Sequence, residues 1–246
     1  MKISRWQFIM GVALLLLSLL LYIILFALFG DIRNILFYLL FNLAFLPIEV
    51  LLVTLILHEL LSFRERQSRM DKMNMVIGAF FGQVGNRLLV IFTNADPKLD
   101  EIKKELVVEG RWSDEKFAEV NQELRRYKYN IELKQVDLNK LNLLLTGQRE
   151  FLLRLLENQV LLEHESFSDL LWAVFHVSEE LTCRKDLSRL IPSDAAHIAS
   201  DIERAYAEVV SQWLDYMRHL KNNYPYLFSL AIRTNPFDDL ASPEVK

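Results

Sequence analysis

The sequence predicts an all-α membrane protein, in which a two-helix transmembrane hairpin precedes a long juxtamembrane helix and a cytoplasmic helical bundle. Two apolar runs near the N-terminus predict the hairpin, because about 20 apolar residues span a bilayer core as a helix. Apolar residues spaced three and four apart predict helices in the remainder. The formal net charge of −4 argues against a general polyanion-binding protein.

The first apolar run covers residues 6–29 and follows two basic residues, Lys2 and Arg5. A secretory signal peptide also begins with basic residues, but its apolar region is about 7–15 residues long and ends at a small-residue cleavage site. This run is longer and lacks such a site. We therefore predict an uncleaved anchor that spans the membrane over about 8–29.

The second apolar run, residues 35–63, follows a polar turn at residues 30–34. A straight helix over this run exceeds the hydrocarbon core of about 30 Å, so it must tilt, protrude or kink at Pro47. We predict a second span over about 35–60, which completes a hairpin domain over 1–63. A re-entrant second segment is the alternative.

Basic residues flank both spans on the same side of the membrane. Lys2 and Arg5 precede the first span, and a basic cluster follows the second. This cluster, which we expect at the membrane surface, consists of Arg64, Arg66, Arg69 and Lys72. Because basic residues accumulate in cytoplasmic flanks, both termini are expected in the cytoplasm of a multi-pass protein of the inner (plasma) membrane. The lipid bilayer is therefore its first expected partner.

Two polar residues, Asn42 and Glu49, lie within the second span and share one helical face. An ionisable residue inside a membrane is costly, and it indicates an ion path, a proton relay or a bond between helices. We favour a protonated Glu49 that bonds a neighbouring helix or a carbonyl freed by Pro47. The alternatives are ion or proton conduction, or a shallower position of Glu49 in the membrane.

Residues 64–95 are predicted to form an amphipathic juxtamembrane helix. One face carries an apolar stripe, and a second face carries Gly78, Gly82 and Gly85. Small residues at this spacing let helix backbones approach closely, so we expect packing against a neighbour, within the chain or in a homo-oligomer. The alternative is a helix on the inner leaflet, where the basic cluster would contact anionic lipids.

Residues 96–237 are predicted to form the cytoplasmic helical domain, and residues 238–246 a disordered tail. A strand is expected only at 127–133. The expected helices, each opened by a capping residue, a proline or a break in the preceding pattern, cover about 97–107, 113–127, 138–145, 149–157, 166–184, 194–221 and 225–235.

The helix over 194–221 is the longest expected in this domain, and its apolar stripe predicts the spine of the bundle. The stripe consists of Ile198, Ile202, Ala205, Val209, Trp213, Tyr216 and Leu220.

Few residue groups could carry catalysis or bind a metal. His176 and Glu180 lie one helical turn apart, and His164 precedes them in a loop. Their spacing matches no motif such as HExxH, so we assign them to an exposed polar face and predict no metal site and no cofactor. Cys183 has no base partner other than His176 and is interpreted as an inert thiol.

Two classes of function remain, and neither is enzymatic, because no phosphate loop, GxSxG or dinucleotide glycine pattern occurs. We favour a membrane-anchored scaffold or sensor that contacts a cytoplasmic protein partner. The alternative is a subunit of a small oligomeric ion channel or transporter with Glu49 in its path, although a TVGYG-like filter is absent. Aromatic residues do not alternate with a basic stripe, so no nucleic-acid partner is expected.

Three segments carry a resemblance to known proteins: FLPIEVLLVT at 45–54, NMVIGAFF at 74–81 and YPYLFSL at 224–230. The chain resembles an uncharacterised group of prokaryotic membrane proteins with two N-terminal transmembrane helices and a helical C-terminal cytoplasmic region. The resemblance covers most of the chain and implies topology alone, since the group carries no known activity.

Overall fold

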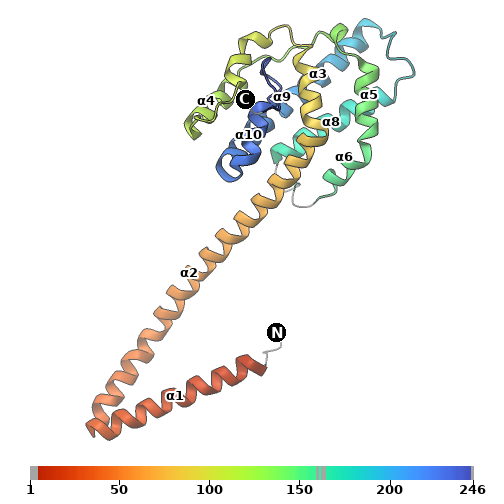
Figure 1. Cartoon of the computed structure of the whole chain (residues 1–246). Coiled ribbons are helices and arrows are strands. Elements are labelled where there is room, and N and C mark those ends of the chain that lie inside the picture. The colour runs from red at the N-terminus through yellow and green to blue at the C-terminus, as the bar shows by residue number, and fades with distance from the viewer. Residues whose placement is uncertain (1–4, 159–160, 162–164, 245–246) are drawn as a thin grey trace. The chain divides into compact units, whose positions relative to one another are not determined.

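The computed structural model describes residues 5–158, 161 and 165–244, and it divides the chain into two compact units at Arg66 and Gln67. The regular secondary structure of these residues consists of α-helices, short 3-10 helices and a π-helical turn, and no strand occurs among them (Figure 1). The all-α prediction is therefore confirmed for the described part of the chain. The two units are described separately.

The N-terminal unit contains α1 (Arg5–Phe29) and the first part of α2 (Ile32–Phe80). Gly30 ends α1 with a φ of +62°, and its N–H donates to the Phe26 carbonyl at 2.9 Å, as in a glycine-terminated helix. Asp31 then caps α2 by accepting from the N–H groups of Arg33 and Asn34 at 3.0 and 3.3 Å. The polar turn is therefore shorter than predicted, because its last residues already belong to α2.

Helix α2 continues beyond the predicted end of the second span and contributes to both units. The helix continues through Pro47 without a break, and its C-terminal residues Met73, Ile77 and Phe80 are buried in the C-terminal unit. A π-helical turn, η1 (Phe81–Gly85), and α3 (Asn86–Thr93) follow directly. The predicted juxtamembrane helix thus corresponds to the end of α2 together with η1 and α3. It continues directly from the second apolar run, because no glycine or proline interrupts the helix around residues 63 and 64.

The C-terminal unit is a helical bundle built around α9 (Pro192–Asn223). Helices α3, α4 (Asp114–Leu124), α8 (Glu165–Thr182) and α10 (Pro225–Arg233) pack on α9. On its other sides α8 contacts α5 (Leu138–Gly147) and α6 (Arg149–Leu156) (Figure 1). All but one residue of the predicted α9 stripe are buried, and Tyr216 is half-buried against Phe81.

The predicted helix over 97–107 is wrong in type, because the structure has two 3-10 turns there, η2 (Leu99–Glu101) and η3 (Lys103–Leu106). The side chain of Asp96 is buried, accepts from Lys98 N at 2.9 Å and accepts from the Tyr127 hydroxyl at 2.7 Å. These tertiary bonds fix the start of the segment, and the 3-10 turns allow Ile102 and Leu106 to reach the core.

The strand expected at 127–133 is also wrong. This segment is irregular, and only the short 3-10 turn η4 (Leu133–Gln135) overlaps its end. Glu132 N donates to the Ala95 carbonyl at 2.8 Å, and Ile131 N donates to the Glu203 carboxylate at 3.0 Å. One backbone bond and one side-chain bond satisfy the local N–H groups without a ladder.

The described part of the predicted disordered tail, residues 238–244, forms turns next to the bundle. Phe237 is buried, and its ring centroid lies 4.9 Å from that of Trp213. Lys103 pairs with Asp239 at 2.5 Å, and Arg233 donates to the Pro243 carbonyl. These contacts explain why the polar composition alone did not predict order here.

Candidate functional site

Two pairs of polar side chains meet where the end of α8 passes the start of α9. His176 and Glu180 lie one turn apart on α8, and His197 and Asp201 lie one turn apart on α9. One ligand atom from each residue lies within 4.8 Å of the others. We call these four residues the α8–α9 quartet.

The shortest distances in the quartet converge on one oxygen of Asp201. Its Oδ2 atom lies 3.3 Å from His176 Nε2 and 3.4 Å from His197 Nε2. Glu180 closes the group, with 4.0 Å from Oε1 to His176 Nε2 and 3.7 Å from Oε2 to His197 Nε2. Each imidazole therefore faces a carboxylate from both helices.

Burial differs sharply across the quartet. The side chain of Asp201 is only 3% exposed, whereas those of His176 and His197 are 43% and 54% exposed. Asp201 Oδ2 has no hydrogen-bond partner among the described residues, although both imidazole nitrogens lie within ion-pair distance. The contacts of this oxygen with the two histidines are therefore ion-pair contacts that do not meet the geometry of a hydrogen bond.

Arg184, in the connection between α8 and α9, holds the acidic groups around the quartet. It donates to Glu180 Oε2 at 2.6 Å and makes two bonds to Asp194, at 2.5 and 2.9 Å. The Arg184 guanidinium lowers the pKa of Glu180 below its ordinary value, and the nearby His176 and His197 contribute in the same direction. Glu180 is therefore held ionised beside the two histidines.

The sequence predicts only half of this arrangement. The spacing pairs His176 with Glu180, which we assigned to an exposed polar face, and His164, the third candidate, lies outside the described residues. His197 and Asp201 were missed. The available signal was the His-x-x-x-Asp spacing in the first turns of α9, which parallels the His-x-x-x-Glu spacing on α8 and gains its meaning from the packing of α8 on α9.

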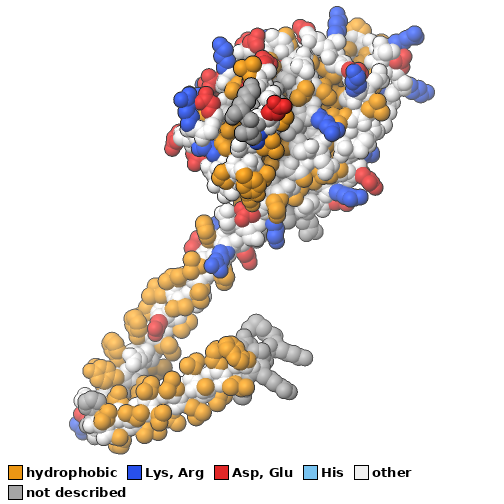
Figure 2. Space-filling view, in the orientation of Figure 1, with side chains coloured by type: hydrophobic (Ala, Val, Ile, Leu, Met, Phe, Trp, Pro, Cys, Tyr) orange, Lys and Arg blue, Asp and Glu red, His pale blue; other side chains and the backbone are white. Residues whose placement is uncertain are grey.

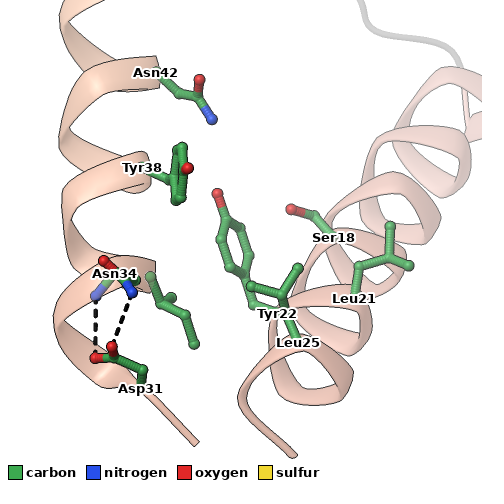
Figure 3. Close-up of a pocket in the computed structure, with 9 residues that line it drawn as sticks. Ser18, Leu21, Tyr22, Leu25, Asp31, Asn34, Tyr38 and Asn42 are labelled. Atoms are coloured by element: carbon green, nitrogen blue, oxygen red, sulfur yellow. Dashed lines mark hydrogen bonds between the residues drawn. The ribbon is translucent and has the colours of Figure 1, made fainter. Parts of the chain in front are cut away.

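The two intramembrane polar candidates lie in different surroundings. Asn42 lines a cavity of about 660 Å³ between α1 and α2, where Ser18, Tyr22 and Tyr38 also face the opening (Figure 3). Glu49 is exposed on α2 and does not line this cavity. The structure therefore does not bring Asn42 and Glu49 into one site.

The three predicted packing glycines have separate roles. A Cβ atom added to Gly78 would lie 2.8 Å from the Tyr216 hydroxyl, so α2 and α9 approach closely at this point. A Cβ atom on Gly85 would lie 2.5 Å from the Phe81 ring, and one on Gly82 would meet open space. Two of the glycines thus serve packing inside the chain, and Gly82 remains on the surface.

The basic cluster and the cysteine are both exposed. Arg64, Arg66 and Lys72 are exposed on α2, and the side chain of Arg69 lies outside the described residues. Arg66 pairs with Glu59 at 3.4 Å, and both side chains are exposed. Cys183 is a free, exposed thiol at the end of α8.

Comparison with known proteins divides the chain where the structure does. Residues 2–61 match a family described as "MJ1433, N-terminal helical domain", and residues 69–233 match "Uncharacterized protein MJ1433, C-terminal helical domain". The chain belongs to the MJ1433 family. An archaeal relative from Methanocaldococcus jannaschii, "Uncharacterized protein MJ1433", is 47% identical over 239 residues, which cover 97% of this chain and 96% of that protein.

No solved structure matches the chain. The two family descriptions name an N-terminal and a C-terminal helical domain. The family descriptions name no activity, ligand or partner, so any function for this chain must be argued from its own residues.

Proposed function

We propose that this member of the MJ1433 family is a non-enzymatic, membrane-anchored scaffold or sensor, whose C-terminal unit contacts a cytoplasmic protein partner. The observation that carries the proposal is the exposed apolar surface of the N-terminal unit. Apart from the half-buried Ile35, its described large apolar side chains are exposed, among them Leu15 at 73% and Phe37 at 64%. Figure 2 shows apolar side chains along both N-terminal helices.

An apolar surface of this extent is unfavourable in water, and the length of the two helices suits a lipid bilayer. Both N-terminal helices are long and apolar enough to cross a membrane, with a mean hydropathy of 2.9 for Ile9–Leu28. A lipid environment also explains why the apolar segment of neither helix is buried by other parts of the chain. The basic cluster that follows supports a cytoplasmic C-terminal unit.

The sensor role is supported by the course of α2. This helix begins among the exposed apolar residues and ends in the buried core of the C-terminal unit, at Met73, Ile77 and Phe80. A partner that binds the C-terminal unit would therefore bind a domain that is joined to the membrane anchor by a continuous helix and not by a flexible linker. Tyr226 and Leu230 on α10 are exposed apolar side chains that offer a surface for such a partner.

The single cysteine provides the test of this topology. Cys183 is exposed, so a membrane-impermeant maleimide should label it in inverted vesicles and should not label it in intact spheroplasts. The matched control is Cys183→Ser combined with Arg33→Cys, which moves the thiol to the first turn of α2, next to the connection from α1. This control should label from the opposite side. Labelling of Cys183 from outside, or release of the chain from membranes by alkaline carbonate, would contradict the proposal.

One observation favours the alternative of an oligomeric channel or transporter subunit. Glu49 is an acidic side chain exposed among apolar neighbours on α2, so lipid alone is a poor neighbour for it. Another subunit could cover it and form a path. Two helices in one chain cannot enclose such a path, and this alternative therefore requires several subunits.

A further inference from the structure

We propose that the α8–α9 quartet, His176, Glu180, His197 and Asp201, binds one divalent first-row transition-metal ion of the Zn²⁺ class. The proposal does not rest on the membrane anchor or on a protein partner. It rests on three properties of the quartet, namely the spacing of its ligand atoms, the state of the buried Asp201 carboxylate and the balance of charge.

The spacing of the ligand atoms matches a tetrahedral ion. Zn²⁺ bonds to imidazole nitrogen and carboxylate oxygen are about 2.0–2.2 Å long, which places neighbouring ligand atoms of a tetrahedron about 3.3–3.6 Å apart. The measured distances from Asp201 Oδ2 to the two histidines are 3.3 and 3.4 Å, and His197 lies 3.7 Å from Glu180. His176 Nε2 lies 4.0 Å from the other Glu180 oxygen, Oε1, and all four residues offer ligand atoms within 4.8 Å of one another. Rotation of the partly exposed Glu180 and histidine side chains would therefore complete the tetrahedron.

Asp201 provides the second, independent observation. Its buried Oδ2 atom accepts no hydrogen bond from the described residues, although a buried carboxylate oxygen normally has a partner. In a metal site each ligand directs its lone pair at the central ion and not at the neighbouring ligand. A cation between the two helices would therefore satisfy Oδ2 and leave the imidazoles oriented as they are.

The charges of the four quartet side chains suit a divalent ion. Two carboxylates and two neutral imidazoles supply the two negative charges that a divalent ion requires. Arg184 does not cancel them, because Asp194 binds this guanidinium in a bidentate pair. Arg184 and Arg204, the latter 3.6 Å from Asp201 Oδ1, instead orient the two carboxylates, as outer residues commonly do in metal sites.

The ligand set also indicates which ion would bind. Imidazole favours zinc, copper, iron and nickel, whereas calcium and magnesium favour sites made of oxygen alone. Two nitrogens with two oxygens therefore select a first-row transition ion. Access is open, because His176 also lines a surface cavity of about 470 Å³ together with Trp172 and Arg204.

A metal-free explanation makes a different prediction. Two protonated histidines could pair with Asp201 and Glu180 as simple ion pairs. That arrangement explains the short distances, but it leaves Oδ2 without a directed hydrogen bond. It also predicts no saturable binding of a metal ion.

The experiment uses the full chain, purified in detergent, stripped with a chelator and dialysed. Zn²⁺ is titrated by calorimetry, and Co²⁺ is added separately as a spectroscopic probe. We expect one equivalent of Zn²⁺ per chain and the intense visible absorption of tetrahedral Co²⁺, which Zn²⁺ should then displace. Absence of saturable Zn²⁺ binding would overturn the proposal.

Variants assign the ligands. His197→Ala and Asp201→Asn should each weaken Zn²⁺ binding by more than the roughly 10–100-fold that loss of an outer residue costs, and should remove the tetrahedral Co²⁺ spectrum. The matched controls, His58→Ala and Glu179→Gln, should bind as the parent chain does. Circular dichroism checks that the helices remain, and the exposed His197 decides the result where Asp201→Asn fails to fold. Unchanged affinity and spectrum in His197→Ala would place the ion elsewhere and refute the site.

Discussion

Individual residues in this protein owe their roles to what lies across from them, as Gly78 and Gly82 show. The two glycines lie four residues apart in the same helical segment, so the sequence pattern treats them alike. Gly78 faces the Tyr216 hydroxyl of α9, and Gly82 faces open space. The same contrast separates Glu180, which is held by Arg184, from Glu179 next to it, which makes one exposed pair with Arg149 at 3.3 Å.

The two glycines make a matched pair for mutation. Gly78→Leu should lower the free energy of unfolding by about 1–3 kcal/mol, because the new side chain must displace Tyr216 from a well-packed contact. Gly82→Leu should be neutral or stabilising by about 1 kcal/mol, since leucine favours helix more than glycine does and nothing lies in its way. Thermal unfolding in detergent measures both, and equal effects would show that Gly78 is not a close-packing position.

Protonation of Glu180 should affect stability in acid. Its pKa in the folded chain is lowered, first by Arg184, so its contribution is complete above the ordinary pKa and is lost as pH falls through the lowered value. In the presence of a chelator, the melting temperature of the parent chain should therefore fall more steeply below about pH 4.5 than that of Glu180→Gln. Glu150→Gln, which removes an exposed pair with Arg154, should keep the parent slope.

Elements of the C-terminal unit derive their stability from α9. This helix begins at Pro192, where proline is tolerated because the N–H groups of the first turn have no partner within the helix, and it ends before Pro225. Its buried stripe contacts elements from both ends of the unit, including α3 and α10. Loss of a large side chain from the stripe should therefore be felt throughout the bundle.

Two tryptophans distinguish the stripe from the surface. Trp213 on α9 is 2% exposed and packs on Phe237, so Trp213→Ala should destabilise the unit by about 3–5 kcal/mol. Trp172 on α8 is 57% exposed, and Trp172→Ala should change stability by less than about 0.5 kcal/mol. Chemical denaturation monitored by circular dichroism compares the two. A neutral Trp213→Ala would mean that the stripe does not hold the bundle together.

At the scale of the whole molecule, the two proposed functions differ in what surrounds Glu49. We expect Glu49 to form a hydrogen bond to a neighbouring helix and not to line an ion path. Glu49→Gln should then be nearly silent, because an amide keeps both a donor and an acceptor. Glu49→Leu should weaken association by roughly 1–2 kcal/mol, the scale of hydrogen bonds between membrane helices.

Measurements of assembly and of flux separate the two functions. Analytical ultracentrifugation in detergent reports association, and reconstituted vesicles report ion flux. A purified chain that conducts ions, with conduction altered by Glu49→Gln while assembly survives, would replace the scaffold or sensor with the channel.

Local patterns in the sequence determined the helical class, the two apolar helices and most helix positions in the C-terminal part. These features depend on composition and on spacings of three and four along one segment, which a single sequence displays directly. The long α9 stripe is the clearest case, because a helix of this length repeats its apolar spacing many times.

Only the tertiary structure decided the features that depend on contacts between distant segments. The 3-10 turns after Asp96 follow from its bond to Tyr127, and the turns of 237–244 follow from the contacts of Phe237 with Trp213 and of Asp239 with Lys103. The α8–α9 quartet is of the same kind. Each helix carries one pair of ligands at ordinary spacing, and no local pattern states that the two pairs face each other, because their approach is created by the packing of α8 on α9.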